Sequence, residues 1–493
     1  MKRKFLPIAV ILALLCALFG LHSCGGDPGD EGGGEAKGGG DHGTVSTEPE
    51  EGASPEERIP TGLPEADLGG YKFRVVSRAE NHVHWFARDI SAEEETGDPI
   101  NDAVYRRNKT IEETYNIEIV DLPQRGNPTE TAQKAVRAGD DMFDVVSTSL
   151  DGVANMGTAG LLFNLRRIPN IDLSKPWWDR QANEQLTIGG RLFGTISNLL
   201  ILDKDATWVF LFNKLLLQEF QLDDLYQMVK SGSWTMDRLL EMMTVASSDL
   251  NGDGTMHERE DRFGLVSENE NAGAFFQTTG EKIISLDKNG MPEVTMFTPR
   301  ALDVCDMIVK LQSNKNITIN PSHHDLQEVI FNDNRGLFLY IGMNRVTLLR
   351  NMETDFGIIP PPKFDKSQDK YYIHVDVGCT SSVAVPVTVP DIGQTGMILE
   401  ALTAESHYTL LPAYYDITLK TKFLRDDESS EMLDLIFSNR VYELGHIFNW
   451  GTAYNFFDSL NRGSNNLSSW WEKNSEKIQT AMEKSMEKIL ELD

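Results

Sequence analysis

The chain contains very little cysteine. Four cysteines occur in 493 residues, at Cys16, Cys24, Cys305 and Cys379. Small secreted domains that lack a sufficient core need many disulfides, so this class of scaffold is excluded. The first two cysteines lie in the N-terminal leader described below. The other two could form one disulfide or stay reduced, and we expect free thiols because a chain of this length needs no cross-link.

Positive charge is also scarce. The chain has 46 Lys and Arg against 75 Asp and Glu, a formal net charge of −29. A surface this negative repels phosphate backbones, which argues against a nucleic-acid partner. The sequence lacks a Gly-x-Ser-x-Gly elbow, a His-Glu-x-x-His zinc helix and a P-loop, which excludes those enzyme classes. Many carboxylates are scattered along the chain, so the composition does not exclude the catalytic carboxylate pair of a glycosidase.

A long apolar run occurs only at the N-terminus. Lys2, Arg3 and Lys4 precede the apolar residues 5–21, a stretch slightly short for a spanning helix and typical of a signal peptide. Residues 21–25 (LHSCG) resemble the lipobox of bacterial lipoproteins. The resemblance implies that residues 1–23 are removed and that Cys24 is diacylated, with palmitate-type chains. An ordinary signal peptide with an incidental cysteine is the alternative.

Large apolar residues are nearly absent from the stretch that follows. Residues 24–66 are rich in glycine and acidic side chains. Such a composition cannot bury enough surface to fold, which predicts a flexible tether. Anchor, tether and globular body together indicate a protein held outside the membrane.

The first globular residues alternate between strand and helix patterns. We expect strands at 71–76, 116–120 and 143–147, and helices at 102–115 and 129–138. This order predicts parallel strands joined by right-handed crossovers, hence an α/β body. Ligands bind beyond the carboxyl ends of such strands, which places residues 147–151 at a binding edge.

The rest of the chain continues the mixture of strands and helices. We expect strands at 207–213, 263–266, 336–340, 356–363 and 382–386. We expect helices at 214–220, 233–243, 299–312, 394–404, 429–439 and 468–492. The order indicates two lobes that the chain crosses more than once, with a cleft between them.

Several motifs in this order resemble a known family. Residues 189–194, 212–214 and 232–240 match the succession GKLY, YNK and TWDEL of the family 1 extracellular solute-binding proteins, the sugar-binding subunits of ABC importers. The resemblance implies an α/β fold of the periplasmic-binding-protein type II class, with two lobes, a ligand cleft and multiple hinge crossings. It assigns residues 67–195 plus 376–425 to lobe 1 and residues 196–375 plus 426–493 to lobe 2.

The family resemblance also implies a function. A monomeric lipoprotein, anchored to the outer face of the bacterial cytoplasmic membrane, would capture a small solute by lobe closure and deliver it to an ABC permease. The expected solute is a sugar or oligosaccharide, and no enzymatic step is expected. The alternatives are a secreted carbohydrate-active enzyme and a calcium-dependent surface interaction protein.

The resemblance places several candidate ligand-binding residues. Sugar sites stack aromatic rings on pyranose faces and bind hydroxyls with carboxylates and amides. The candidates are Thr148, Asp151, Trp178, Asp205, Thr207, Phe276, Tyr340 and Trp450. Each aromatic candidate can instead be a core residue. Trp178 is chosen over Trp177 because adjacent side chains of an extended segment point in opposite directions.

The stretch Asp249–Glu260 (DLNGDGTMHERE) has the spacing of an EF-hand calcium loop. Its predicted ligands are Asp249, Asn251, Asp253, Thr255 through its carbonyl, and Glu260. Only one such loop occurs, and a strand pattern follows it, so we expect a structural calcium ion that pins the loop. A turn without an ion is the alternative.

Overall fold

The computed structural model describes residues 58–80, 85–268, 271–323, 325–415 and 427–492. The expected signal peptide, Cys24 and most of the expected tether lie outside these residues. The stretch Arg58–Asp493 forms one compact unit. Within the described ranges, no helix combines the length and apolar character needed to cross a membrane.

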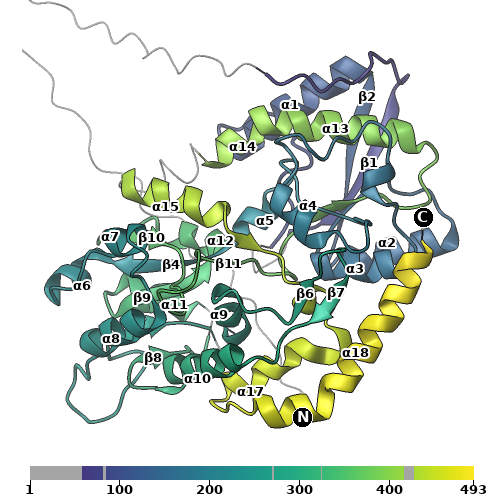
Figure 1. Cartoon of the computed structure of the whole chain (residues 1–493). Coiled ribbons are helices and arrows are strands. Elements are labelled where there is room, and N and C mark those ends of the chain that lie inside the picture. Colours follow the sequence, from purple (N-terminus) through teal and green to yellow (C-terminus); the bar gives the residue numbers. More distant parts are fainter. Residues whose placement is uncertain (1–57, 81–84, 269–270, 324, 416–426, 493) are drawn as a thin grey trace, which may run out of the picture. The chain divides into compact units, whose positions relative to one another are not determined.

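The first sheet carries the expected parallel strands (Figure 1). Its order is β12 (Ser382–Ala384), β3 (Val145–Thr148), β1 (Tyr71–Arg78) and β2 (Ile117–Gln124). β1 pairs in parallel with both β2 and β3, and β12 runs antiparallel to β3. The crossover helices are α1 (Pro99–Tyr115) and α2 (Thr129–Ala138). The strand and helix patterns near the start of the globular part are therefore confirmed, with shifts of a few residues at their ends.

Local sequence explains where α1 starts and stops. The Asp98 carboxylate accepts hydrogen bonds from the backbone N–H groups of Ile100 and Asn101, and Pro99 occupies the first turn. Asn116 ends the helix in the left-handed conformation at φ 50°. β2 therefore begins directly after α1, which sets its register against β1.

The second sheet is mixed. Its order is β10 (Phe356–Ile359), β4 (Trp208–Asn213), β9 (Gly336–Gly342), β5 (Phe263–Val266) and β8 (Thr318–Ile319). β4 is antiparallel to β9 and β10, whereas β5 is parallel to β8 and β9. All residues of β4 and β9 are buried, as expected for central strands covered on both faces.

Further elements surround the two sheets. The short strands are β6 (Ile284–Leu286), β7 (Pro292–Val294), β11 (Ile373–His374) and β13 (Arg440–Val441). The helices before residue 300 are α3 (Leu150–Thr158), η1 (Leu165–Arg167), α4 (Arg180–Leu186), α5 (Leu202–Asp205), α6 (Lys214–Glu219), α7 (Leu225–Lys230), α8 (Met236–Ala246), α9 (Ala272–Thr278) and α10 (Pro299–Ser313). The later helices are α11 (Leu326–Asn332), α12 (Met343–Val346), η2 (Thr347–Leu349), α13 (Ile392–Tyr408), α14 (Leu410–Pro412), α15 (Asp427–Phe437), α16 (Leu444–Ile447), η4 (Trp450–Phe456), α17 (Phe457–Asn461) and α18 (Leu467–Glu491).

The chain passes between the elements of the two sheets more than once. It leaves the first sheet before β4, returns between β10 and β12, and leaves again between α13 and α15. Two of these passages lie side by side, because Thr207 forms an antiparallel bridge with Val375. β11, in the returning passage, pairs in parallel with β13. The exact division into lobes stays a prediction.

The last helix and the cysteines agree with the sequence. α18 buries Ile478, Met482, Met486 and Ile489 along one stripe, so these residues pack in the core. Cys305 is buried and Cys379 is partly buried, and both are free thiols.

Candidate functional site

Polar side chains gather where β3 runs into α3. The Thr148 hydroxyl is buried and donates to Asn127 Oδ1 at 2.8 Å. Asp151 lies in the first turn of α3, and its Oδ1 has no hydrogen-bond partner among the described residues. The Leu150 N–H donates to the Val377 carbonyl at 3.3 Å, which brings residues 376–380 against the start of α3. The end of β3 and this returning passage therefore form one edge.

The two candidates at the first crossing are buried and already paired. Asp205 accepts hydrogen bonds from the Tyr414 hydroxyl at 2.9 Å and from Arg88 Nη2 at 3.0 Å. The Thr207 hydroxyl donates to the Asp203 carbonyl at 2.9 Å. These contacts fix the start of β4 and leave Asp205 little capacity to bind a further group.

An aromatic cluster lies at the end of β9 beside the start of β4. Tyr340 and Trp208 meet edge to face with ring centroids 5.1 Å apart. Both are buried, yet the Tyr340 hydroxyl and the Trp208 indole Nε1 have no hydrogen-bond partner within the described part of the chain. A buried unpaired polar group costs roughly 1–3 kcal/mol, so a partner supplied by water or ligand is the physical expectation.

Two histidines extend this cluster, and sequence analysis missed both. His374 Nδ1 and Gln277 Oε1 lie 2.9 Å apart, so one nitrogen of the ring is paired. His446 stacks on Tyr454 with ring centroids 3.7 Å apart and lies 6.0 Å from His374. Burial lowers the pKa of His446 to about 3, and burial together with His446 lowers the pKa of His374 well below its usual range. Both rings are therefore neutral near pH 7.

Close approaches connect the edges of the two sheets. The Trp85 ring lies 3.6 Å from the position that a Cβ would take on Gly342, the last residue of β9. Arg78, the last residue of β1, donates from Nη2 to the Gly378 carbonyl at 2.8 Å. The ends of β1 and β9 and the returning passage are thus neighbours. Neither Trp85 nor Arg78 had a sequence signal beyond its place after a strand.

Three aromatic candidates lie in packed surroundings away from this edge. Trp178 Nε1 donates to Glu400 Oε2 at 2.9 Å, and Trp177 Nε1 donates to the other oxygen of Glu400 at 2.8 Å. The argument that this pair must point in opposite directions is wrong, because the segment turns: the Trp178 N–H donates to the Lys175 carbonyl. Phe276 has no exposed surface, and Trp450 stacks on its neighbour Phe448 at 4.4 Å.

The predicted calcium loop is held by its own hydrogen bonds. The Asp249 carboxylate accepts from the N–H groups of Gly252 at 2.7 Å and Gly254 at 2.8 Å, and both glycines have positive φ. Asn251 Nδ2 donates to Glu260 Oε2 at 2.8 Å and to Asp253 Oδ2 at 3.3 Å. Across the described residues, no three His, Cys, Asp or Glu side chains are grouped closely enough to hold a metal ion. The loop has the turn that a calcium site needs, and the ion itself stays a prediction.

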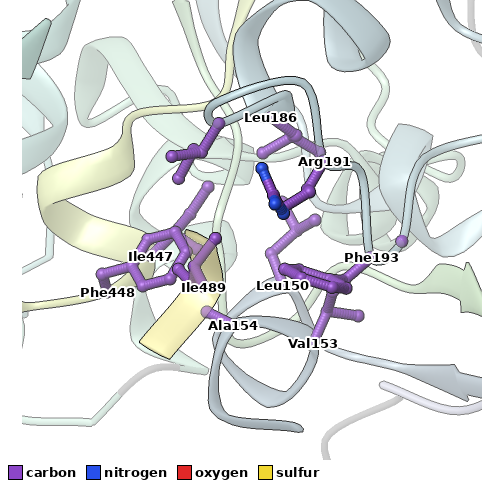
Figure 2. Close-up of a pocket in the computed structure, with 11 residues that line it drawn as sticks. Leu150, Val153, Ala154, Leu186, Arg191, Phe193, Ile447, Phe448 and Ile489 are labelled. Atoms are coloured by element: carbon purple, nitrogen blue, oxygen red, sulfur yellow. The ribbon is translucent and has the colours of Figure 1, made fainter. Parts of the chain in front are cut away.

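Figure 2 shows a separate apolar pocket between α3, the chain around residue 190, α16 and α18. Its lining includes Val153, Phe193 and Ile489. The one charged residue of the lining, Arg191, donates to the carbonyls of Gly189, Leu490 and Leu492 and so holds the end of α18. None of the predicted ligand-binding residues lines this pocket. Its chemistry does not suit a polyhydroxylated ligand.

Comparisons with known proteins give the fold. No family model matches the sequence, and no curated protein matches it. The galacto-N-biose/lacto-N-biose I-binding protein of a Bifidobacterium longum ABC transporter superposes with a TM-score of 0.59 at 13% identity, over 85% of this chain and 98% of that chain. An ABC substrate-binding protein from Listeria monocytogenes in complex with cycloalternan gives 0.54 at 12% identity, over 84% and 98%.

A cyclo/maltodextrin-binding protein complexed with maltotetraose gives a TM-score of 0.54 at 15% identity, over 88% of this chain and 98% of that chain. The chain has the type II periplasmic-binding-protein fold. The expected α/β class with two lobes is therefore confirmed. In a periplasmic-binding-protein fold the carboxyl ends of the strands face the ligand, and in this chain several of the unpaired polar atoms lie near those ends, such as Asp151 Oδ1 after β3 and Asn344 Oδ1 after β9.

Proposed function

We propose that this chain is the substrate-binding component of an ABC importer and binds a small neutral solute, a sugar or oligosaccharide. The observation that carries the proposal is the edge where β1, β3 and β9 end. In a fold built for ligand capture, that edge holds buried polar groups without partners among the described residues, including the Tyr340 hydroxyl and the Trp208 indole. Three solved proteins of the same fold are saccharide-binding proteins or were solved in complex with a saccharide.

The groups at this edge favour a neutral ligand. Asp205 is paired with Arg88 and Tyr414, and Asp376 accepts from the N–H groups of Gly378 and Cys379. The unpaired atoms include one carboxylate oxygen, Asp151 Oδ1, and the others are mostly neutral: an indole N–H, a phenol, amides and one imidazole. Hydroxyl groups both donate and accept, so a polyol can satisfy such a mixed set without bringing a charge into a buried site.

Binding acts by lobe closure. A ligand that contacts both lobes only in the closed form shifts the open–closed equilibrium by its differential affinity for that form. Trp85, after β1, lies close to Gly342 at the end of β9, so groups from both sheets lie within reach of one bound molecule. The solute is released unchanged, and no covalent step is part of this function.

The N-terminal features complete the proposal. Cleavage after Ser23 and acylation of Cys24 would anchor the protein to the outer face of the cytoplasmic membrane, because two acyl chains suffice for stable anchoring. The glycine-rich residues up to 66 would let the globular part reach its permease. In the loop Asp249–Glu260, a calcium ion would be structural.

A thermal-shift screen tests the binding function. The chain without residues 1–24 is suitable, because Arg58–Asp493 forms a compact unit by itself. It is screened against mono- and oligosaccharides of differing linkage, with amino acids and short peptides as controls. A ligand present at about 100 times its Kd stabilises the native state by about 2.7 kcal/mol, which raises Tm. Stabilisation by amino acids or peptides alone would contradict the sugar proposal.

A further inference from the structure

A buried ionic cluster lies beside the passages between the two sheets. Its members are Arg440 of β13, Asp179 at the start of α4, and Asp203 of α5. Arg440 Nη1 lies 2.6 Å from Asp203 Oδ2, and Arg440 Nη2 lies 2.5 Å from Asp179 Oδ2. Tyr442 adds a hydrogen bond from its hydroxyl to Asp179 Oδ2 at 3.2 Å. We call these four residues the hinge cluster.

The charged side chains of the hinge cluster are almost completely shielded from solvent. The side chain of Arg440 is 7% exposed, that of Asp203 is fully buried, and that of Asp179 is 15% exposed. Buried ion pairs contribute little net stability, because desolvation offsets their attraction. Asp203 is also paired with the buried Lys204, whose Nζ lies 3.2 Å from Asp203 Oδ1. Loss of Arg440 therefore removes the cation from Asp179, while Asp203 keeps Lys204 as a partner. Such an arrangement is better suited to holding one geometry than to stabilising the fold.

The cluster joins segments that belong to different passages. Asp203 precedes β4, the first strand reached after the chain leaves the first sheet. β13 pairs with β11 of the returning passage, where the Ile373 N–H donates to the Asn439 carbonyl at 3.0 Å. Asp179 donates its N–H to the Ile196 carbonyl and follows Trp178, which packs in the core of the first sheet.

A second set of contacts holds the same segments in register. Gln185 of α4 accepts from the Tyr442 N–H at 3.0 Å and donates to the Arg440 carbonyl at 3.3 Å. The guanidinium of Arg440 is a rigid planar fork, and each arm meets a carboxylate on a different helix. Rotation of β13 against α4 and α5 would therefore break at least one ion pair.

We propose that Arg440 is a positioning residue for ligand capture: it fixes the angle at which the two lobes meet while the site is empty. The inference rests on the proposed function, since it assumes that closure turns about these passages. Arg440 contributes no group to the ligand. It acts by making one lobe arrangement dominate over others, which sets the fraction of molecules competent to bind.

The chain offers a matched control. Arg74 forms a comparable ion pair with Asp144, with Nε 3.0 Å from Oδ2, inside the first sheet. Arg74→Met removes the guanidinium from one buried carboxylate, Asp144, and Arg440→Met removes it from two, Asp179 and Asp203. Only Arg440→Met alters the segments that run between the two sheets.

Distance measurement between spin labels tests the proposal without any ligand. Labels are attached to cysteines at the exposed positions Lys134 of α2 and Thr244 of α8. The full chain is used in detergent micelles, with Cys16, Cys24 and Cys379 replaced so that only the buried Cys305 remains. The wild type and Arg74→Met are expected to give the same single distance population. Arg440→Met is expected to add a second population or shift the first.

Identical distributions in all three proteins would overturn the proposal. If Arg440→Met does not fold, Asp179→Asn and Tyr442→Phe weaken the same cluster more gently and are held to the same expectation. Arg440→Lys keeps the charge but not the fork, so it is expected to restore the wild-type distribution only in part. These distances do not depend on which solute binds. A failed sugar screen would therefore contradict the proposed function and leave this result standing.

Discussion

At the scale of single residues, the most informative groups are buried polar atoms that the fold leaves unpaired. The Tyr340 hydroxyl is the clearest of them, because its residue has no exposed surface and no described residue offers it a partner. Its aromatic ring is well packed against Trp208, Phe210 and Phe275. Core packing accounts for an aromatic ring at this position, and binding to a ligand or water accounts for its hydroxyl group.

The variant Tyr340→Phe separates these two roles. Removing an unpaired buried hydroxyl should leave the free energy of unfolding unchanged or slightly higher, whereas sugar affinity should fall by about 0.5–1.5 kcal/mol, the net value of one hydrogen bond. Urea unfolding and calorimetric titration measure the two quantities. The control is Tyr371→Phe, whose hydroxyl donates to the Val229 carbonyl at 3.1 Å, and it should lose stability and keep affinity. Equal affinity in both variants would rule out a ligand contact by Tyr340.

Glu400 shows a different use of a buried polar group. It has no exposed surface and accepts hydrogen bonds from the indoles of both Trp177 and Trp178. Burial raises the pKa of this carboxyl, while the two indole donors oppose that shift. The tryptophan pair is therefore anchored within the core of the first lobe.

Replacement of Glu400 by alanine should be strongly destabilising. The variant leaves two buried indole N–H groups without partners and opens a cavity, and we expect a loss of about 2–4 kcal/mol in the free energy of unfolding. Glu400→Gln keeps an acceptor and the volume, so it should lose clearly less. Urea denaturation followed by tryptophan fluorescence provides the measurement. Equal losses in the two variants would show that the hydrogen bonds to the carboxylate are not what holds the pair.

At the scale of elements, the loop Asp249–Glu260 gives a direct prediction. Calcium should raise the Tm of the wild type by binding the native loop, and the double variant Asp253→Asn/Glu260→Gln should lose this response. Asp287→Asn is the matched control, since Asp287 caps another turn by accepting from the N–H groups of Asn289 and Met291. A wild type that does not respond to millimolar calcium would contradict a metal role for the loop.

The sequence predicted the elements better than the site, and the reason is physical. Strand alternation and helix periodicity depend on neighbours in the chain, so β1, α2 and β5 appear where their patterns lie. The hydrogen-bond partners of a side chain come from distant segments: Asp205 meets Arg88 and Tyr414, and Trp178 meets Glu400. No local pattern contains such pairings. His374 and His446 were missed for the same reason.

At the scale of the whole molecule, two neutral histidines, the buried His374 and the partly buried His446, make stability depend on pH. Both His374 and His446 have lowered pKa values in the folded state, because burial disfavours the charged ring. In the unfolded chain each titrates near pH 6.5. Below that pH the two histidines bind protons in the unfolded state but not in the folded state. They therefore lower the free energy of unfolding as the pH falls.

Buried acids such as Asp89, whose pKa burial raises to about 6, act in the opposite direction, so the effect is best read as a difference between variants. His446→Phe should lose less stability than the wild type between pH 7.5 and pH 5. His257→Gln changes an exposed histidine and should follow the wild type. Urea unfolding at several pH values gives the comparison. Parallel curves for all three proteins would contradict the lowered pKa of His446.

The account as a whole depends on a solute that is captured and released intact. Calorimetric titration of the mature chain with an oligosaccharide found by thermal shift, followed by chromatography of the recovered sugar, tests this most directly. We predict saturable binding of one molecule per chain and recovery of the sugar at its original length. Shortened sugar in the recovered fraction, or no saturable binding by any member of a broad saccharide panel, would contradict the account.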